Sequence, residues 1–129
     1  MQETNKNYPD ELQQGFALFN QGKYYEAHEA FETAWQKTKA PDREFYRALL
    51  QISGGFFRLV QNRPKAAIKF FSHALKWLSL FTDEHLGIDV SMLKKDLNVI
   101  IDTIDKGELE LQKIKELLHP LDPQESRKS

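Results

Sequence analysis

Two stretches of the chain repeat each other at an offset of forty residues, and this repeat constrains the fold more than any other feature. Without a gap, six positions are identical: Gly15 and Gly55, Phe16 and Phe56, Gln21 and Gln61, Ala27 and Ala67, Phe31 and Phe71, and Ala34 and Ala74. About one identity is expected by chance over such a stretch, so a duplicated structural unit is the first interpretation to consider. Apolar residues in both copies recur at steps of three or four, which indicates helices.

Each copy predicts a helix, a short turn and a second helix. We expect the four helices to begin near Pro9, Lys23, Asp42 and Pro64. Pro and acidic residues favour the first turn of a helix, and Gly22 is a typical helix end. A fifth helix is expected after a cap at Asp89 or Ser91 and ends at Gly107, and residues 108–118 are also compatible with a helix. The sequence therefore predicts an all-α protein.

The repeated Ala-x-x-x-Phe element resembles that of tetratricopeptide repeats, whose unit is two antiparallel helices. It is formed by Ala27 and Phe31 in the first copy and by Ala67 and Phe71 in the second. The chain departs from that pattern in its forty-residue spacing, and it lacks the usual Trp and Leu of the first helix. The resemblance implies a tetratricopeptide-like bundle of two helical hairpins plus a C-terminal capping helix.

Length and composition favour one helical domain over residues 1–129, with flexible ends at 1–8 and 120–129. The formal net charge is -1, so no global field attracts nucleic acid or anionic lipid, and we expect neither as a partner. Cysteine is absent, which excludes disulfides and thiolate metal sites. No apolar run approaches the ~20 residues of a membrane span, so we expect a soluble cytoplasmic protein.

The candidate site lies in the second predicted helix, where polar side chains interrupt an apolar stripe. His28 and Glu32 are four residues apart and therefore point the same way. The second copy has Ile68 where the first has His28, which indicates an inward-facing position. A half-buried imidazole needs a polar partner, and Glu32 is the nearest candidate. Gln51, Arg47 and Arg58, on the next helix, could complete the group.

The combination of motifs resembles the bacterial and archaeal domain-of-unknown-function family 309. A His-Glu-x-x-Glu-x-x-Trp signature is formed here by His28, Glu29, Glu32 and Trp35. Similar residues precede it (Phe19, Asn20, Gly22 and Tyr24 or Tyr25) and follow it (Gln51 to Gly55, and Gly87 to Val90). The resemblance covers about residues Glu11 to Leu118. Family members usually have a histidine where this chain has Arg58. The resemblance implies an all-helical fold and no established activity.

Three interpretations of the site remain open. In the first, the protein is a binding module for a protein or peptide partner or a small anionic molecule, and exposed aromatic residues such as Tyr46, Phe57 or Trp77 line its groove. In the second, it is a metal-dependent hydrolase or another small enzyme. His28 and Glu32 are then metal ligands or an acid–base pair, Gln51 orients the substrate, and Arg47 or Arg58 holds an anion. In the third, the same residues form a structural network. No cofactor is predicted, although His28 and Glu32 could ligate a divalent metal.

Two further features lie outside this group. Gly54 and Gly55 interrupt a helix at a cost of roughly 1 kcal/mol each, so we expect a close neighbour there. His73, His85 and His119 are isolated in the sequence, and we predict that they are exposed or at helix ends rather than ligands. Residues 82–89 are expected to form a connection.

Overall fold

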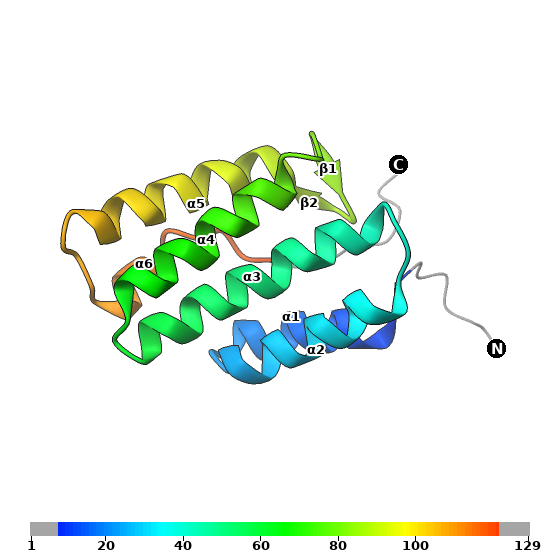
Figure 1. Cartoon of the computed structure of the whole chain (residues 1–129), viewed down its shortest axis with the longest axis horizontal. Helices are drawn as coiled ribbons and strands as arrows, with labels where there is room; N and C mark the ends of the chain where they lie inside the picture. The colour runs from blue at the N-terminus through cyan, green and yellow to red at the C-terminus, as the bar shows by residue number, and fades with distance from the viewer. Residues whose placement is uncertain (1–7, 122–129) are drawn as a thin grey trace.

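The computed structural model describes residues 8–121, which form six helices and one short β-hairpin (Figure 1). The elements are α1 (Asp10–Asn20), α2 (Tyr24–Lys37), α3 (Asp42–Val60), α4 (Pro64–Leu78), β1 (Glu84–His85), β2 (Ile88–Asp89), α5 (Val90–Asp105) and α6 (Leu111–Lys115). The predicted all-α class is confirmed. None of these helices combines the length and the apolar character that crossing a membrane requires.

The forty-residue repeat is visible in the turns that join α1 to α2 and α3 to α4. Gly22 and Asn62 occupy equivalent positions, and both have left-handed backbones with φ of +80° and +64°. The next residue, Lys23 or Arg63, donates its amide hydrogen to the carbonyl oxygen five residues earlier, at 2.9 and 2.8 Å. The two helical hairpins therefore share one turn geometry, although glycine occupies the left-handed position in only one of them.

The repeat also fixes how the helices of each hairpin pack. Gly15 lies so close to the ring of Phe31 that an added Cβ would approach its Cε1 to 2.5 Å, and Gly55 lies equally close to Phe71. Phe56 meets Phe71 edge to face at a centroid distance of 5.2 Å, and the equivalent pair in the first hairpin lies at 5.1 Å. A missing side chain on one helix thus admits a phenylalanine ring from the next.

Each of the helices α1 to α5 packs against the next one along the chain, so that α3 lies between α2 and α4 (Figure 1). Phe56 of α3 is in the centre of the core, where its ring contacts Phe19, Tyr24 and Phe71 from three other helices. The partners of α4 are α3 and α5. One face of α3 is therefore flanked by α2 and α4, and this arrangement creates the groove described below.

Residues 82–89, expected to be a plain connection, contain an antiparallel hairpin. Its turn places Leu86 and Gly87 in the left-handed region, with φ of +55° and +79°. His85 is held between the rings of Phe45 and Phe81, with both centroids 4.7 Å away, and its Nε2 lies 2.7 Å from Asp42 Oδ1. These contacts of His85 attach the hairpin to the first turn of α3, which contains Asp42 and Phe45. The predicted isolation of His85 is wrong.

The expected capping of α5 is confirmed at Asp89, whose Oδ1 accepts a hydrogen bond from the Met92 amide at 2.9 Å.

Buried Asp96 on α5 accepts hydrogen bonds from both the backbone amide and the Nδ1 of His119, at 2.9 and 2.8 Å. His119 is exposed, as predicted, and it is also partnered with Asp96. The helix predicted over 108–118 shortens to α6.

The ends that were predicted to be flexible, 1–8 and 120–129, lie mostly outside the described residues. Within the described part, Leu121 is buried and its carbonyl oxygen accepts a hydrogen bond from Asn20 Nδ2 at 3.2 Å. The segment after α6 therefore returns to the end of α1.

Candidate functional site

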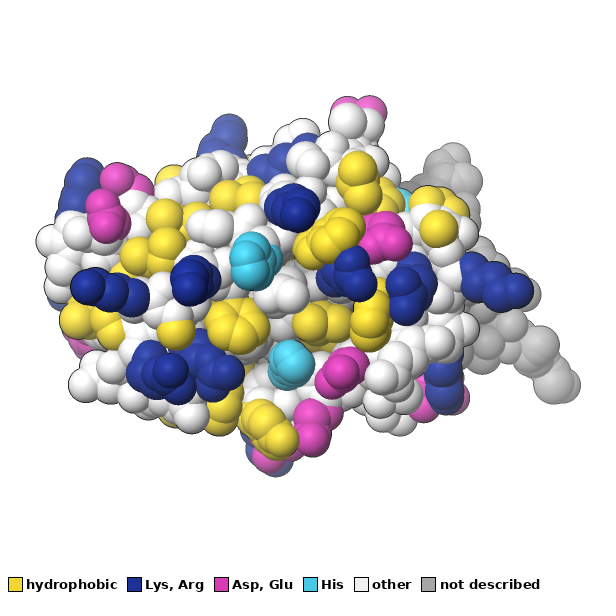
Figure 2. Space-filling model, viewed as in Figure 1, with side chains coloured by type: hydrophobic (Ala, Val, Ile, Leu, Met, Phe, Trp, Pro, Cys, Tyr) yellow, Lys and Arg dark blue, Asp and Glu magenta, His cyan; other side chains and the backbone are white. Residues whose placement is uncertain are grey.

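A groove of about 480 Å³ runs over α3 between α2 and α4, and we call it the polar groove. The wall on α2 is formed by His28, Glu32 and Trp35. The floor on α3 is formed by Arg47, Leu50 and Gln51, and the wall on α4 by His73, Lys76 and Trp77. On this face of the molecule, histidine, basic and hydrophobic side chains gather over the three helices, and acidic ones lie mainly along α2 (Figure 2).

The α2 wall exists because His28, Glu32 and Trp35 follow one another at steps of four and three residues. All three side chains are half-buried. The hydrogen-bonded pair expected from the spacing of His28 and Glu32 is not formed among the described residues. Burial lowers the pKa of the His28 imidazole below its usual value, and the neighbouring negative charge of Glu32 opposes that shift.

Arg47 occupies the middle of the groove floor and lies between two indole rings. Its guanidinium carbon is 4.9 Å from the ring centre of Trp35 on α2 and 4.3 Å from that of Trp77 on α4. Arg43, one turn earlier, lies 4.2 Å above the Trp35 ring. Both tryptophans of the chain therefore line the groove, and their rings lie next to guanidinium cations.

Two polar atoms of this site are buried without a hydrogen-bond partner among the described residues: Trp35 Nε1 and Gln51 Oε1. The first is a donor and the second an acceptor. Buried polar groups are almost always paired in folded proteins, and an unmet one costs about 1–3 kcal/mol. The residues lining the groove thus include one unmatched donor and one unmatched acceptor, which a ligand reaches only when the two side chains turn toward it.

The α4 wall contains two residues that the sequence prediction did not assign to the site, His73 and Lys76. His73 is exposed, as predicted, and it lines the groove opposite α2. Its spacing of three to Lys76 and four to Trp77 was the available signal, because these steps place all three on one helix face.

A second, smaller pocket of about 100 Å³ adjoins the polar groove at His28, and we call it the aromatic pocket. Its other residues are Tyr25 on α2, Gly54, Phe57 and Arg58 on α3, and Phe70 on α4. The guanidinium carbon of Arg58 lies 5.6 Å from the Phe57 ring centre and 5.1 Å from that of Phe70. Arg58 therefore belongs to this pocket and not to the polar groove.

The five predicted binding residues are thus distributed over two adjoining pockets. His28, Glu32, Arg47 and Gln51 line the polar groove, and Arg58 and again His28 line the aromatic pocket. The signature also includes Glu29 and Trp35. Glu29 is exposed, and Trp35 lines the polar groove. Their assignment as ligand-binding residues stays a prediction.

The predicted aromatic lining is partly wrong. Tyr46 is fully buried, and burial raises the pKa of its hydroxyl. Phe57 and Trp77 do line the two pockets. No residue of α5 contributes to either lining among the described residues, so the groove is not filled by that helix. The close neighbours expected at Gly54 and Gly55 are the rings of Phe70 and Phe71.

A metal site would have His28 and Glu32 as its ligands. No group of three or more His, Asp or Glu side chains that could hold a metal ion occurs within residues 8–121. Catalytic zinc sites usually have three protein ligands, and the cationic side chains of Arg47 and Lys76 line the same groove.

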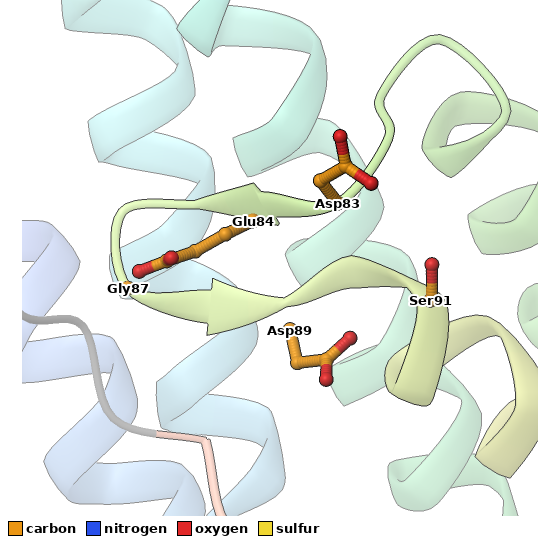
Figure 3. A pocket seen from close by; sticks show the side chains of 5 residues that line it. All are labelled: Asp83, Glu84, Gly87, Asp89 and Ser91. Atoms are coloured by element: carbon orange, nitrogen blue, oxygen red, sulfur yellow. The ribbon is translucent and has the colours of Figure 1, made fainter.

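A third hollow, of about 440 Å³, lies at the β-hairpin, where Asp83, Glu84 and Asp89 come together with Gly87 and Ser91 (Figure 3). Asp89 already caps α5, and the carbonyl oxygen of Asp83 accepts a hydrogen bond from the Val90 amide at 2.7 Å. The Asp89 carboxylate is therefore already used at the junction between the hairpin and α5.

One family model, described as a domain of unknown function (DUF309), matches residues 12–70. This range includes the α2 wall and the groove floor but ends before His73, Lys76 and Trp77. No curated protein and no solved structure matches the chain.

Proposed function

We infer the function from the groove itself, because the family model that matches residues 12–70, DUF309, is described without an activity. We propose that the protein is a binding module and that its polar groove holds a short acidic segment of a partner protein. The observation that carries the proposal is the unmatched pair of Trp35 Nε1 and Gln51 Oε1 in a pocket that also contains Arg47.

The unmatched donor and acceptor favour a peptide as the occupant. A peptide group has one N–H and one C=O, so it can donate to Gln51 Oε1 and accept from Trp35 Nε1. Such hydrogen bonds would satisfy groups that are otherwise buried and unpaired. The groove volume of about 480 Å³ is within the usual range of roughly 300–1,000 Å³ for ligand sites.

The charges around the groove favour an acidic side chain on that peptide. Arg47 on the floor and Lys76 on the α4 wall offer cationic donors, and a guanidinium can bind a carboxylate through two parallel hydrogen bonds. Glu32 on the opposite wall repels a second carboxylate. An acidic side chain would therefore be directed toward α3 and α4, and the peptide would have one preferred placement across the groove.

Fluorescence titration tests this proposal, because the two tryptophans of the chain both line the groove. The probes are a mixture of acetylated, amidated hexapeptides with one fixed Glu and the matched mixture with Gln. A third mixture, with Gln and a free C-terminus, distinguishes binding of a side-chain carboxylate from binding of the terminal carboxylate. We expect the Glu mixture to change the emission at lower concentration than the Gln mixture.

Two variants complete the design. Arg47→Gln should remove the preference for Glu, whereas Arg63→Gln, at an exposed residue outside both pockets, should retain it. Equal responses to the Glu and Gln mixtures, or no response to any mixture, would contradict the proposal. A response to citrate without any response to peptides would instead favour a small anionic molecule.

A further inference from the structure

The two pockets are related by a shift of seven residues along α3. The floor of the polar groove consists of Arg47, Leu50 and Gln51, and the residues of α3 in the aromatic pocket are Gly54, Phe57 and Arg58. Seven residues are close to two helical turns, so both sets lie on the same face of α3. On α2, the same shift in the opposite direction relates Trp35 to His28 and Glu32 to Tyr25. The two pockets therefore lie one after the other along the same helices and adjoin at His28, with a polar end and an aromatic end.

We propose that the aromatic pocket is a subsite for one apolar side chain of the peptide, and that the ligand is an extended segment with an acidic and an apolar residue three positions apart. This inference rests on the proposed function, since it assigns the second contact of the same ligand. In this proposal Tyr25, Phe57 and Phe70 select an apolar side chain of the peptide. Arg47 and Lys76 select an acidic side chain at the other end.

The spacing follows from helix geometry. A shift of seven residues along α3 corresponds to about 10.5 Å at 1.5 Å per residue. A peptide in the polyproline II conformation advances about 3.1 Å per residue with three residues per turn, so residues three apart are separated by about 9.3 Å and point the same way. Residues two apart in that conformation span only about 6 Å and point in different directions.

The lining of the aromatic pocket fits an apolar group of the size of one side chain. The rings of Tyr25 and Phe57 lie 5.3 Å apart, and Gly54 contributes no side chain to the floor. The volume of about 100 Å³ is roughly three times the ~30 Å³ that one water molecule occupies in the liquid. Tyr25 is 51% exposed, so its ring is accessible to a ligand side chain.

Arg58 closes the end of this pocket and is already engaged. Its Nη1 donates a hydrogen bond to Gln61 Oε1 at 2.7 Å, and its guanidinium faces the Phe57 and Phe70 rings. A carboxylate that binds Arg58 would have to displace these contacts, whereas an apolar side chain could pack against the rings and leave them in place. Arg47 also has an acidic neighbour, since its Nη1 lies 3.8 Å from Glu44 Oε1, but this distance is too long for a hydrogen bond. The acidic residue of the ligand is therefore assigned to the Arg47 end.

The experiment compares acetylated, amidated hexapeptides of identical composition by tryptophan fluorescence with the full chain. One pair has the core Glu-Pro-Pro-Leu or its reverse, Leu-Pro-Pro-Glu, and the control has Glu-Pro-Leu-Pro. A further peptide replaces Leu by Ala in the three-apart core. We expect one of the two three-apart peptides to bind about tenfold more tightly than both the two-apart control and the Ala peptide, because the subsite removes the Leu side chain from water.

Variants identify the subsite. Tyr25→Ala should abolish the preference for Leu over Ala while leaving the preference for Glu over Gln unchanged. Val99→Ala, at a 45% exposed position on α5, is the matched control and should alter neither preference. Circular dichroism of each variant confirms that it is folded.

The outcomes separate the two proposals. If Glu peptides bind but Leu and Ala peptides bind equally, or if Tyr25→Ala keeps the preference for Leu, the apolar subsite is wrong and the acidic groove stands. If no peptide binds, both proposals are overturned. Binding in which the two-apart control equals the three-apart peptides would contradict the assigned spacing.

Discussion

The guanidinium carbon of Arg47 lies 4.3 Å from the ring centre of Trp77, a residue thirty positions away on the neighbouring helix. The same guanidinium carbon lies 4.9 Å from the ring centre of Trp35. One side chain from α3 thus contacts both walls of the polar groove, at the end where we place the acidic residue of the ligand.

Replacing Arg47 by Lys tests whether the flat guanidinium matters beyond its charge. An ammonium group retains the positive charge but cannot stack on two indole planes. Cation–π contacts at partly exposed sites are worth about 0.5–1 kcal/mol each, so Arg47→Lys should lower the free energy of unfolding by about 1 kcal/mol. Urea denaturation measures this change, and Arg63→Lys is the matched control. An unchanged free energy of unfolding would show that the stacking is energetically neutral.

The lowered pKa of His28 predicts a pH-dependent contribution to stability. Because burial disfavours the charged imidazole, the unfolded chain takes up this proton at higher pH than the folded chain. The stabilisation is therefore complete above the unfolded value near 6.5 and is lost as the pH falls through the lower, folded pKa.

The measurement is the free energy of unfolding of wild type and His28→Leu between pH 8 and pH 5. The difference between the two proteins isolates His28 from the other histidines, and it should shift in favour of the variant as the pH falls. A difference that is constant with pH would contradict the assigned burial of this imidazole.

The equivalence of the two hairpins predicts matched effects of adding a methyl group at Gly15 and at Gly55. In each case an added Cβ would lie 2.5 Å from a ring carbon of a buried phenylalanine, so the ring must move. Overpacking of this kind costs about 1–3 kcal/mol, which exceeds the gain of roughly 1 kcal/mol from the better helix propensity of alanine.

We therefore expect Gly15→Ala and Gly55→Ala each to lower the free energy of unfolding. Gly54→Ala should cost less, because its neighbour Phe70 is only half-buried and has room to shift. Chemical denaturation ranks the three variants. Stabilisation by either of the first two would show that the close approach of glycine and ring is not required.

Added metal should not stabilise the protein, because the groove offers His28 and Glu32 as ligands next to two cationic side chains. Thermal unfolding of the full chain with zinc or manganese, compared with the same protein in a chelator, measures this. A rise in the unfolding temperature that His28→Leu abolishes would contradict this prediction and favour the metal-dependent alternative.

Much of the fold could be predicted because the repeated residues are ones whose side-chain size determines how two helices pack. Gly15 and Gly55 mark the same close approach, and Phe31 and Phe71 fill it. The starts of the first four helices were within one residue of their observed positions, since Pro64 and the acidic first turns act locally. The last helix begins at Leu111, three residues after the expected start. The β-hairpin was not predicted, because each of its strands has only two residues.

The candidate site was only partly predictable, because a local sequence pattern places residues on one helix face but does not show which helix packs opposite it. The steps of four and three residues from His28 to Glu32 and from Glu32 to Trp35 placed the α2 wall correctly, because helix periodicity is local. Which residues come to lie opposite that wall is decided by how α4 packs on α3. His73 was therefore missed. The partners of His85 and His119 lie 43 and 23 residues away, and no local pattern predicts such distant contacts.

Backbone and indole chemical-shift mapping tests the central claim most directly. The chain has two tryptophans, so its spectrum contains two indole Nε1–H signals, and both belong to the polar groove. Adding the Glu-Pro-Pro-Leu peptide in its two orders should shift both indole signals and the amides of α2, α3 and α4, and should leave those of α5 and α6 in place. Unmoved indole signals at millimolar peptide, or shifts confined to α5 and α6, would contradict a ligand site in this groove.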